Sequence, residues 1–166
     1  MDSRSQEDPS QELERLAEEQ IADLDAENSE RKLRSKQRRE RVVTLYAAGM
    51  VQSPRDHYHA ALVMLYGEEA GHFDLARQLA ERATHNGEAR AWSVVAAAWD
   101  RSLLARGKPQ RFGTQFVRGD QGRWSLGSVD ERVTDAERAF YAVPPLWVQR
   151  QHLAHILRRE DNTSES

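Results

Sequence analysis

The stretch Trp99 to Phe116, WDRSLLARGKPQRFGTQF, joins a helical pattern to a short segment of different character. The helical pattern runs into Gly107, a Lys-Pro turn follows, and the remaining residues mix polar and aromatic side chains. Polar residues of unusual type concentrate here: Asp100, Arg101, Gln110, Thr114 and Gln115. We therefore expect this stretch to end a buried helix and to contain the candidate site.

Upstream of this stretch, the periodicity predicts helical segments over residues 54–66, 73–85 and 88–106. Pro54 after Ser53 is the favoured order at a helix start, and Asn86-Gly87 is a stop signal. The third segment is the most apolar, so we expect it to be the central helix. Small alanines at the helix contacts resemble tetratricopeptide-like antiparallel helix pairs, which stack into a curved array with a concave binding face.

Downstream of the Lys-Pro turn, the pattern predicts a small β-hairpin near residues 112–126. Residues 110–118 are expected to form a short strand, and Gly119 to Gly122 the turn. Thr134 then suits the cap of a short helix that ends near Tyr141. A Val-Pro-Pro break precedes a last amphipathic helix over 146–159, and we expect residues 160–166 to be disordered.

The N-terminal part is the most highly charged region. We expect residues 1–10 to be disordered and residues 11–41 to form one long amphipathic helix, acidic in its first half and basic from Arg31 to Arg41. The basic run could bind nucleic acid or an acidic partner. Alternatively, it could balance the acidic half, within the chain or across an antiparallel dimer. We favour the second interpretation because no aromatic residue is interleaved before Tyr46.

Composition limits the remaining possibilities. The chain has 166 residues, a net charge of −3 and no cysteine, which excludes disulfides and thiolate chemistry. The length suits one domain, expected over 42–159, with appendages. The start of the sequence has no apolar signal segment, and no apolar run reaches the roughly 20 residues that a membrane span needs. We therefore expect a cytoplasmic protein that does not enter a membrane.

The run DR-x-L-x3-GKPQ-x-FGTQ, residues 100–115, resembles an uncharacterised family of bacterial helical proteins of unknown function. The resemblance extends upstream to AALVMLYGEEAGHFDLARQLA, residues 60–80, and downstream to VPPL at 143–146, leaving the charged N-terminal part outside. In these relatives a His-Gly pair often ends the first helix, where this chain has Tyr66-Gly67. The resemblance implies a fold and a site location, but no reaction.

The polar set has two interpretations. In the first, Arg101 and the two glutamines bind a carboxylate, phosphate or peptide ligand, because Arg offers a planar donor fork and Gln both a donor and an acceptor. In the second, Arg101 pairs internally with a carboxylate such as Asp100 or Asp74. The glutamines would then tie the turn and hairpin to the helices.

Metal and covalent chemistry lack a recognisable pattern. Glu69 and His72 have Glu-x-x-His spacing, but Gly71 interrupts the helix that would align them, and a dinuclear site needs a second copy. The chain has no nucleophile elbow and no Gly-rich phosphate loop. We therefore expect no metal and no cofactor, and the sequence leaves open whether the protein is an enzyme.

The function we favour from the sequence is a non-enzymatic interaction module that binds a peptide or protein partner in a helical groove near Arg101, Gln110 and Gln115. The N-terminal helix would serve for oligomerisation or docking, with a homodimer as one option, and we do not expect nucleic-acid binding. The alternative is a small enzyme or small-molecule-binding protein. Its pocket would lie around Asp100, Arg101, Gln110, Thr114 and Gln115.

Overall fold

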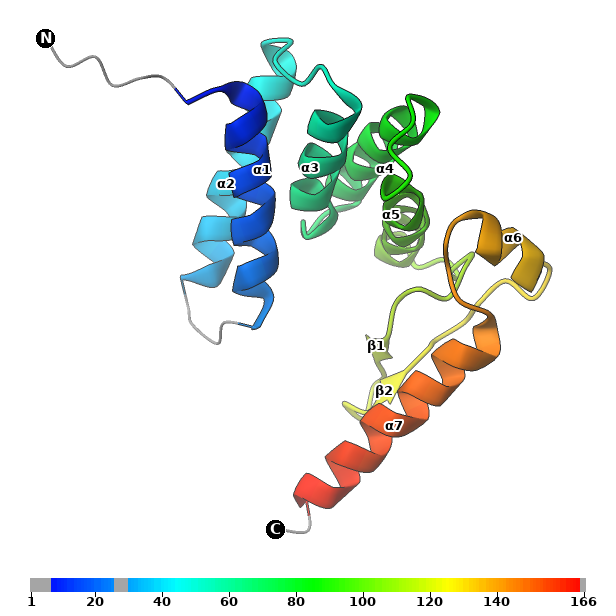
Figure 1. The fold of residues 1–166 in the computed structure, drawn as a ribbon. Helices are drawn as coiled ribbons and strands as arrows, with labels where there is room; N and C mark the ends of the chain where they lie inside the picture. Colours follow the sequence, from blue (N-terminus) through cyan, green and yellow to red (C-terminus); the bar gives the residue numbers. More distant parts are fainter. Residues whose placement is uncertain (1–6, 26–29, 165–166) are drawn as a thin grey trace, which may run out of the picture.

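The computed structural model describes residues 7–25 and 30–164 (Figure 1). Within them the chain forms seven α-helices, a single 3-10 turn and one two-stranded antiparallel hairpin. The predicted mainly α fold with a small β-hairpin is therefore confirmed.

Helices α3 (Pro54–Leu65), α4 (Ala70–His85) and α5 (Ala91–Ala105) form the centre of the molecule, and α4 packs against both of the others. The Ser53 hydroxyl accepts the N–H of Asp56, whose carboxylate accepts the N–H of Ser53, so local capping starts α3. Alanine at the contacts lets neighbouring helix axes approach closely. The fully buried alanines of α3 and α4 are Ala60, Ala61, Ala76, Ala80 and Ala83.

The N-terminal part differs from the single charged helix expected over 11–41. It forms α1 (Pro9–Ala22), a 3-10 turn (Asp23–Asp25) and α2 (Arg31–Ala47), and both helices pack against α3. Leu13 and Leu16 of α1 are buried in the same core as α3, α4 and α5. The segment therefore folds back onto the domain, and the boundary expected at residue 42 falls inside α2.

Ion pairs join α2 to α1 and to the 3-10 turn in this folded-back arrangement. Asp23 accepts hydrogen bonds from Arg34 at 2.8 and 2.9 Å and from Arg38 at 2.6 Å. These two arginines hold the pKa of Asp23 well below its usual range. Glu12 pairs with Arg41 at 2.6 Å, although in one continuous helix the two would lie about 43 Å apart. The basic half therefore balances the acidic half within the chain, one of the arrangements the sequence left open.

The hairpin is shorter than expected, with β1 (Val117–Arg118) and β2 (Trp124–Ser125) paired as Val117 to Ser125 and Arg118 to Trp124. The strand predicted over 110–118 forms only at its end. The backbone N–H groups of Arg111, Phe112 and Thr114 donate instead to the Asp100 carboxylate, and a ladder cannot use them.

The C-terminal part consists of α6 (Asp135–Phe140) and α7 (Leu146–Ser164), and α7 packs against β2. A second small core forms around Phe112, together with Ala96, Val133 and Val143. No helix in the described ranges combines the length and apolar character needed to cross a membrane.

Both chain ends differ from the expected disorder where the structure describes them. Helix α1 begins at Pro9, capped by the Asp8 carboxylate, and α7 continues to Ser164 beyond the predicted end at residue 159. Residues 1–6 and 165–166, which belong to the same expectation, lie outside the described residues.

Candidate functional site

All five predicted site residues belong to one hydrogen-bonded network where the 108–115 loop passes the end of α5. Asp100 is its centre and has no exposed surface. One carboxylate oxygen accepts the N–H groups of Arg111 at 2.7 Å and Phe112 at 2.9 Å. The other accepts the N–H and the hydroxyl of Thr114, at 2.9 and 2.8 Å. Asp100 therefore fixes the course of the loop.

Gln110 is also fully buried and binds only the chain itself. Its Nε2 donates to the carbonyls of Gln115 at 2.9 Å and Leu126 at 2.7 Å, and its Oε1 accepts the N–H of Gln115 at 2.9 Å. Its backbone bonds Ser128 and Asp130 in an isolated bridge. Gln110 thus ties the loop to the segment after the hairpin, as the structural interpretation expects of a glutamine.

Arg101 differs from these two residues because no carboxylate in the described ranges pairs with it, neither Asp100 nor Asp74. Its Nε donates to Gln115 Oε1 and its Nη1 to the carbonyl of Leu65, both at 2.9 Å. Its guanidinium carbon lies 4.9 Å from the centre of the Tyr66 ring. Burial lowers the pKa of Arg101, with Tyr66 acting in the opposite direction.

The carbonyl end of α3 accounts for part of this arrangement. Leu65 ends α3, and Tyr66 follows it as the cap residue. Arg39, which is buried, donates through Nη1 to the Tyr66 carbonyl at 3.4 Å and to Ser35 Oγ at 2.7 Å. Arg39 and Arg101 therefore both approach the negative end of the α3 dipole, which favours cations. The two guanidinium groups carry more positive charge than the partial negative charge at the end of α3 can balance.

Arg39 and Tyr66 both lie at the end of α3 near Arg101, but neither was among the predicted site residues. Arg39 lies in the basic run, whose charge pattern does not distinguish buried from solvated arginines. The sequence drew attention to Tyr66 only through the resemblance, which implies a histidine at that position.

Beside Arg101 lies a groove of about 330 Å³ between α3, α5 and the segment 142–149. Most of its lining side chains are aromatic or aliphatic, and Thr114 and Gln115 of the hydrogen-bonded network also line it. The lining includes Tyr58, Leu62, Tyr66, Ser93, Val94 and Gln115. Neither tyrosine hydroxyl has a hydrogen-bond partner in the part of the chain that the structure describes.

The histidines do not gather into a site. Among the described residues, no group of three or more His, Asp or Glu side chains could hold a metal ion. His72 Nδ1 instead accepts the N–H groups of Glu68 and Glu69 at the start of α4, at 3.1 and 3.2 Å. His72 therefore acts there as a helix cap.

Of the five predicted residues, Asp100 and Gln110 are closed off by their own hydrogen bonds, whereas Arg101, Thr114 and Gln115 are only partly buried. Comparison of the chain with protein-family models, with curated proteins and with solved structures finds no match.

Proposed function

We propose that the protein is a non-enzymatic interaction module whose groove between α3 and α5 binds a peptide segment that carries a carboxylate. The observation that carries this proposal is Arg101. It is a partly buried cation bonded to Gln115 of the groove, and no carboxylate in the described residues pairs with it. Removing water from a cation that no anion pairs with is costly, and a carboxylate from a partner would compensate it.

The groove offers the other contacts that a peptide needs. Tyr58 and Leu62 provide apolar wall, and the tyrosine hydroxyls can each donate and accept a hydrogen bond to a peptide backbone. Asp100 and Gln110 hold Thr114 and Gln115 in place from behind. An enzyme would instead need the polar set to converge on open space, so this arrangement favours binding over catalysis.

The test begins with selection of random displayed peptides on the wild-type protein, followed by calorimetry of the selected peptides. Ser93 is exposed on the rim of the groove, so Ser93→Arg fills the groove without disturbing the core. We expect this variant to abolish peptide binding. Ser128→Arg, an equally exposed change outside the groove, is the matched control and should bind as the wild type does.

Arg101→Gln separates binding from stability. If Arg101 recognises the partner, the variant loses about tenfold or more in affinity for carboxylate-bearing peptides while remaining folded at the assay temperature. A lowered melting temperature, together with no peptide that binds the wild type, would show that Arg101 only locks the loop. The proposal would then be wrong.

A homodimer through the N-terminal segment belongs to the same proposal, as does a cytoplasmic location. The apolar stripe of α1 is used by the core, so such a dimer would use the exposed side of α2, where Val43 and Tyr46 are exposed. Sedimentation of the wild type and of Tyr46→Glu tests it: a dimer that the variant dissociates supports the idea, and a monomer at all concentrations contradicts it. We do not propose nucleic-acid binding, because Arg34, Arg38 and Arg41 are paired with Asp23 and Glu12.

A further inference from the structure

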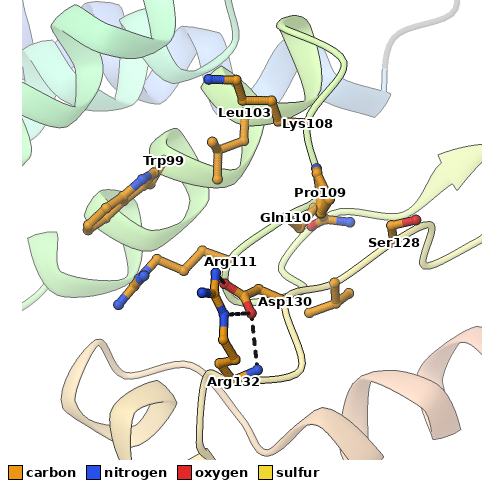
Figure 2. A pocket seen from close by; sticks show the side chains of 10 residues that line it. Trp99, Leu103, Lys108, Pro109, Gln110, Arg111, Ser128, Asp130 and Arg132 are labelled. Carbon is orange, nitrogen blue, oxygen red and sulfur yellow. Dashed lines mark hydrogen bonds and ion pairs between the residues drawn. The ribbon is translucent and has the colours of Figure 1, made fainter.

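A second cavity, of about 430 Å³, lies between α5, the 108–111 loop and the segment 128–132 (Figure 2). None of its lining residues belongs to the groove described above. Figure 2 shows Trp99 and Leu103 on one side, Gln110 and Ser128 across from them, and Arg111 and Arg132 below. The volume falls within the range of small-molecule sites.

The apolar side of this cavity is a fixed aromatic plate. The guanidinium carbons of Arg77 and Arg111 lie 3.6 and 4.9 Å from the centre of the Trp99 ring, and the Phe112 ring packs edge-on at 5.7 Å. Leu103 and Val129 continue the apolar lining. A compact apolar group would therefore find a preformed surface on Leu103, Val129 and the part of Trp99 that lines the cavity, with little ordering cost on binding.

The carboxylate and side-chain amide acceptors of the cavity are already used. Asp130 receives the backbone N–H and Nε of Arg132 on one oxygen and Nη2 on the other, all at 3.0 Å. Arg132 lowers the pKa of Asp130 to about 2, so the carboxylate is ionised at neutral pH and paired. Gln110 spends its side-chain oxygen and both of its Nε2 protons on the chain.

The donors, in contrast, have spare capacity. Arg111 gives one Nη to Glu137, and its other Nη donates to no described residue. The Lys108 ammonium and the Ser128 hydroxyl likewise have no hydrogen-bond partner in residues 7–25 and 30–164. Of the three cations in the lining, Arg132 is paired with Asp130 and Arg111 with Glu137, so Lys108 alone has no carboxylate partner among the described residues. Free donors and excess positive charge together select an anionic acceptor.

From this pairing of a fixed apolar plate with unused cationic donors, we propose that the cavity binds a small organic oxyanion. The ligand is a carboxylate or phosphate monoester with a compact apolar body. The body lies against Trp99 and Leu103, and the oxyanion is bound by Lys108 with Arg111 and Ser128. This site is separate from the peptide groove and does not depend on the function proposed for it.

Three probes of similar size test the proposal by calorimetry at low salt: phenylacetate, phenyl phosphate and neutral 2-phenylethanol. We expect at least one acid to bind about tenfold or more tightly than the alcohol, and the tighter of the two acids identifies the oxyanion class. Lys108→Gln should weaken acid binding about three- to tenfold. Lys36→Gln, a change of an exposed lysine on α2, should leave it unchanged.

Ser128 supplies the matched pair at the cavity itself. Ser128→Glu places a negative charge at the rim and should abolish acid binding, whereas Ser128→Gln, of nearly the same size and still a donor, should only weaken it. Ser93→Arg should retain acid binding, since Ser93 belongs to the other groove. Equal affinity for the alcohol and the acids, wild-type affinity in Lys108→Gln, or no binding of either acid would each overturn the proposal.

Discussion

The carboxylate of Asp100 accepts four hydrogen bonds from residues 11 to 14 positions further along the chain, and solvent does not reach it. An ionised carboxylate suits this set because it only accepts. The donors are three backbone N–H groups and one hydroxyl, and none has a strand partner to use instead. At the scale of single residues, this is the interaction that shapes the candidate site.

Asp100→Asn should therefore be strongly destabilising, although it is nearly isosteric. The amide replaces one acceptor oxygen by a donor that faces the Thr114 N–H. We expect a loss of about 2–3 kcal/mol in the free energy of unfolding, and a fall in Tm of about 4–10 °C. Thermal and urea unfolding measure both.

Asp74→Asn is the control for this change. The Asp74 side chain is 41% exposed, pairs with Arg106 and accepts the Ser102 hydroxyl at 2.6 Å, a bond that Asn can still accept, so Asp74→Asn should cost about 1 kcal/mol or less. Equal effects of the two substitutions would contradict the central role of Asp100.

His59 predicts a pH dependence at the same scale. Its side chain is buried, and its Nδ1 has no hydrogen-bond partner among the described residues. Burial lowers the pKa of His59, while the charge of Glu14 raises it in part. Because the folded-state pKa lies below the unfolded-state value, the unfolded chain takes up the proton first. Stability is therefore retained above about pH 6.5 and lost as the pH falls through that value.

We expect the free energy of unfolding to decrease between about pH 7.5 and 5.5, and His59→Gln to reduce that decrease. Urea titrations at several pH values measure it. His152→Gln, a change of an exposed histidine on α7, should leave the pH profile unchanged. An identical profile for the wild type and His59→Gln would rule His59 out as the responsible group.

At the scale of elements, Gly113 lies directly against the first turn of α7. Gly113 has a φ of 77°, in the left-handed region, and a Cβ at this position would lie 2.9 Å from Leu146 Cδ1. Gln149 of α7 also donates to the Gly113 carbonyl at 3.2 Å. The loop whose backbone Asp100 binds therefore also packs against the first turn of α7.

Gly113→Ala should be destabilising for two reasons, the backbone strain of about 1–2 kcal/mol and the contact with Leu146. Gly122→Ala separates them, because Gly122 has a similar φ of 73° and a Cβ at that position would meet no atom within 4 Å. We expect urea unfolding to show a clearly larger loss for Gly113→Ala. Adding Leu146→Ala to Gly113→Ala should restore part of the lost stability. Equal losses at the two glycines would show that the contact with Leu146 does not contribute.

At the scale of the whole molecule, the N-terminal helices are part of the domain. Figure 1 shows α1 and α2 beside α3 at one end of the helical row, with α6 at the other. Leu13 is fully buried in the common core, whereas Leu33 on α2 is 57% exposed. The protein should therefore unfold in one transition that includes α1.

Leu13→Ala tests this integration. Removing a fully buried leucine side chain should cost about 2–4 kcal/mol and shift the whole transition, whereas Leu33→Ala should change stability by less than about 0.5 kcal/mol. Circular dichroism follows the helices, and near-ultraviolet signals follow the aromatic core around α5. A separate early transition in Leu13→Ala, with the aromatic signal unchanged, would show that α1 is an independent arm.

The helices of the centre could be predicted from the sequence because their signals are local. Ser53 and Pro54 start α3, Asn86-Gly87 follows α4, and Gly107 follows α5, all within a few residues of the backbone they control. The five polar residues predicted for the site lie within 16 positions of the chain, and the structure joins them in one hydrogen-bonded network.

Only the tertiary structure decided how those residues are used. Asp100 and Gln110 are saturated by the chain, Arg101 has no carboxylate partner among the described residues, and the strand expected over 110–118 is reduced to two residues. The charged N-terminal segment forms two helices, in which Asp23 and Glu12 pair with Arg34, Arg38 and Arg41 of α2 and the apolar face of α1 is buried on α3. Caps and turns depend on near neighbours and can be read from the sequence, whereas the partners of a buried charge come from distant positions that folding alone brings together.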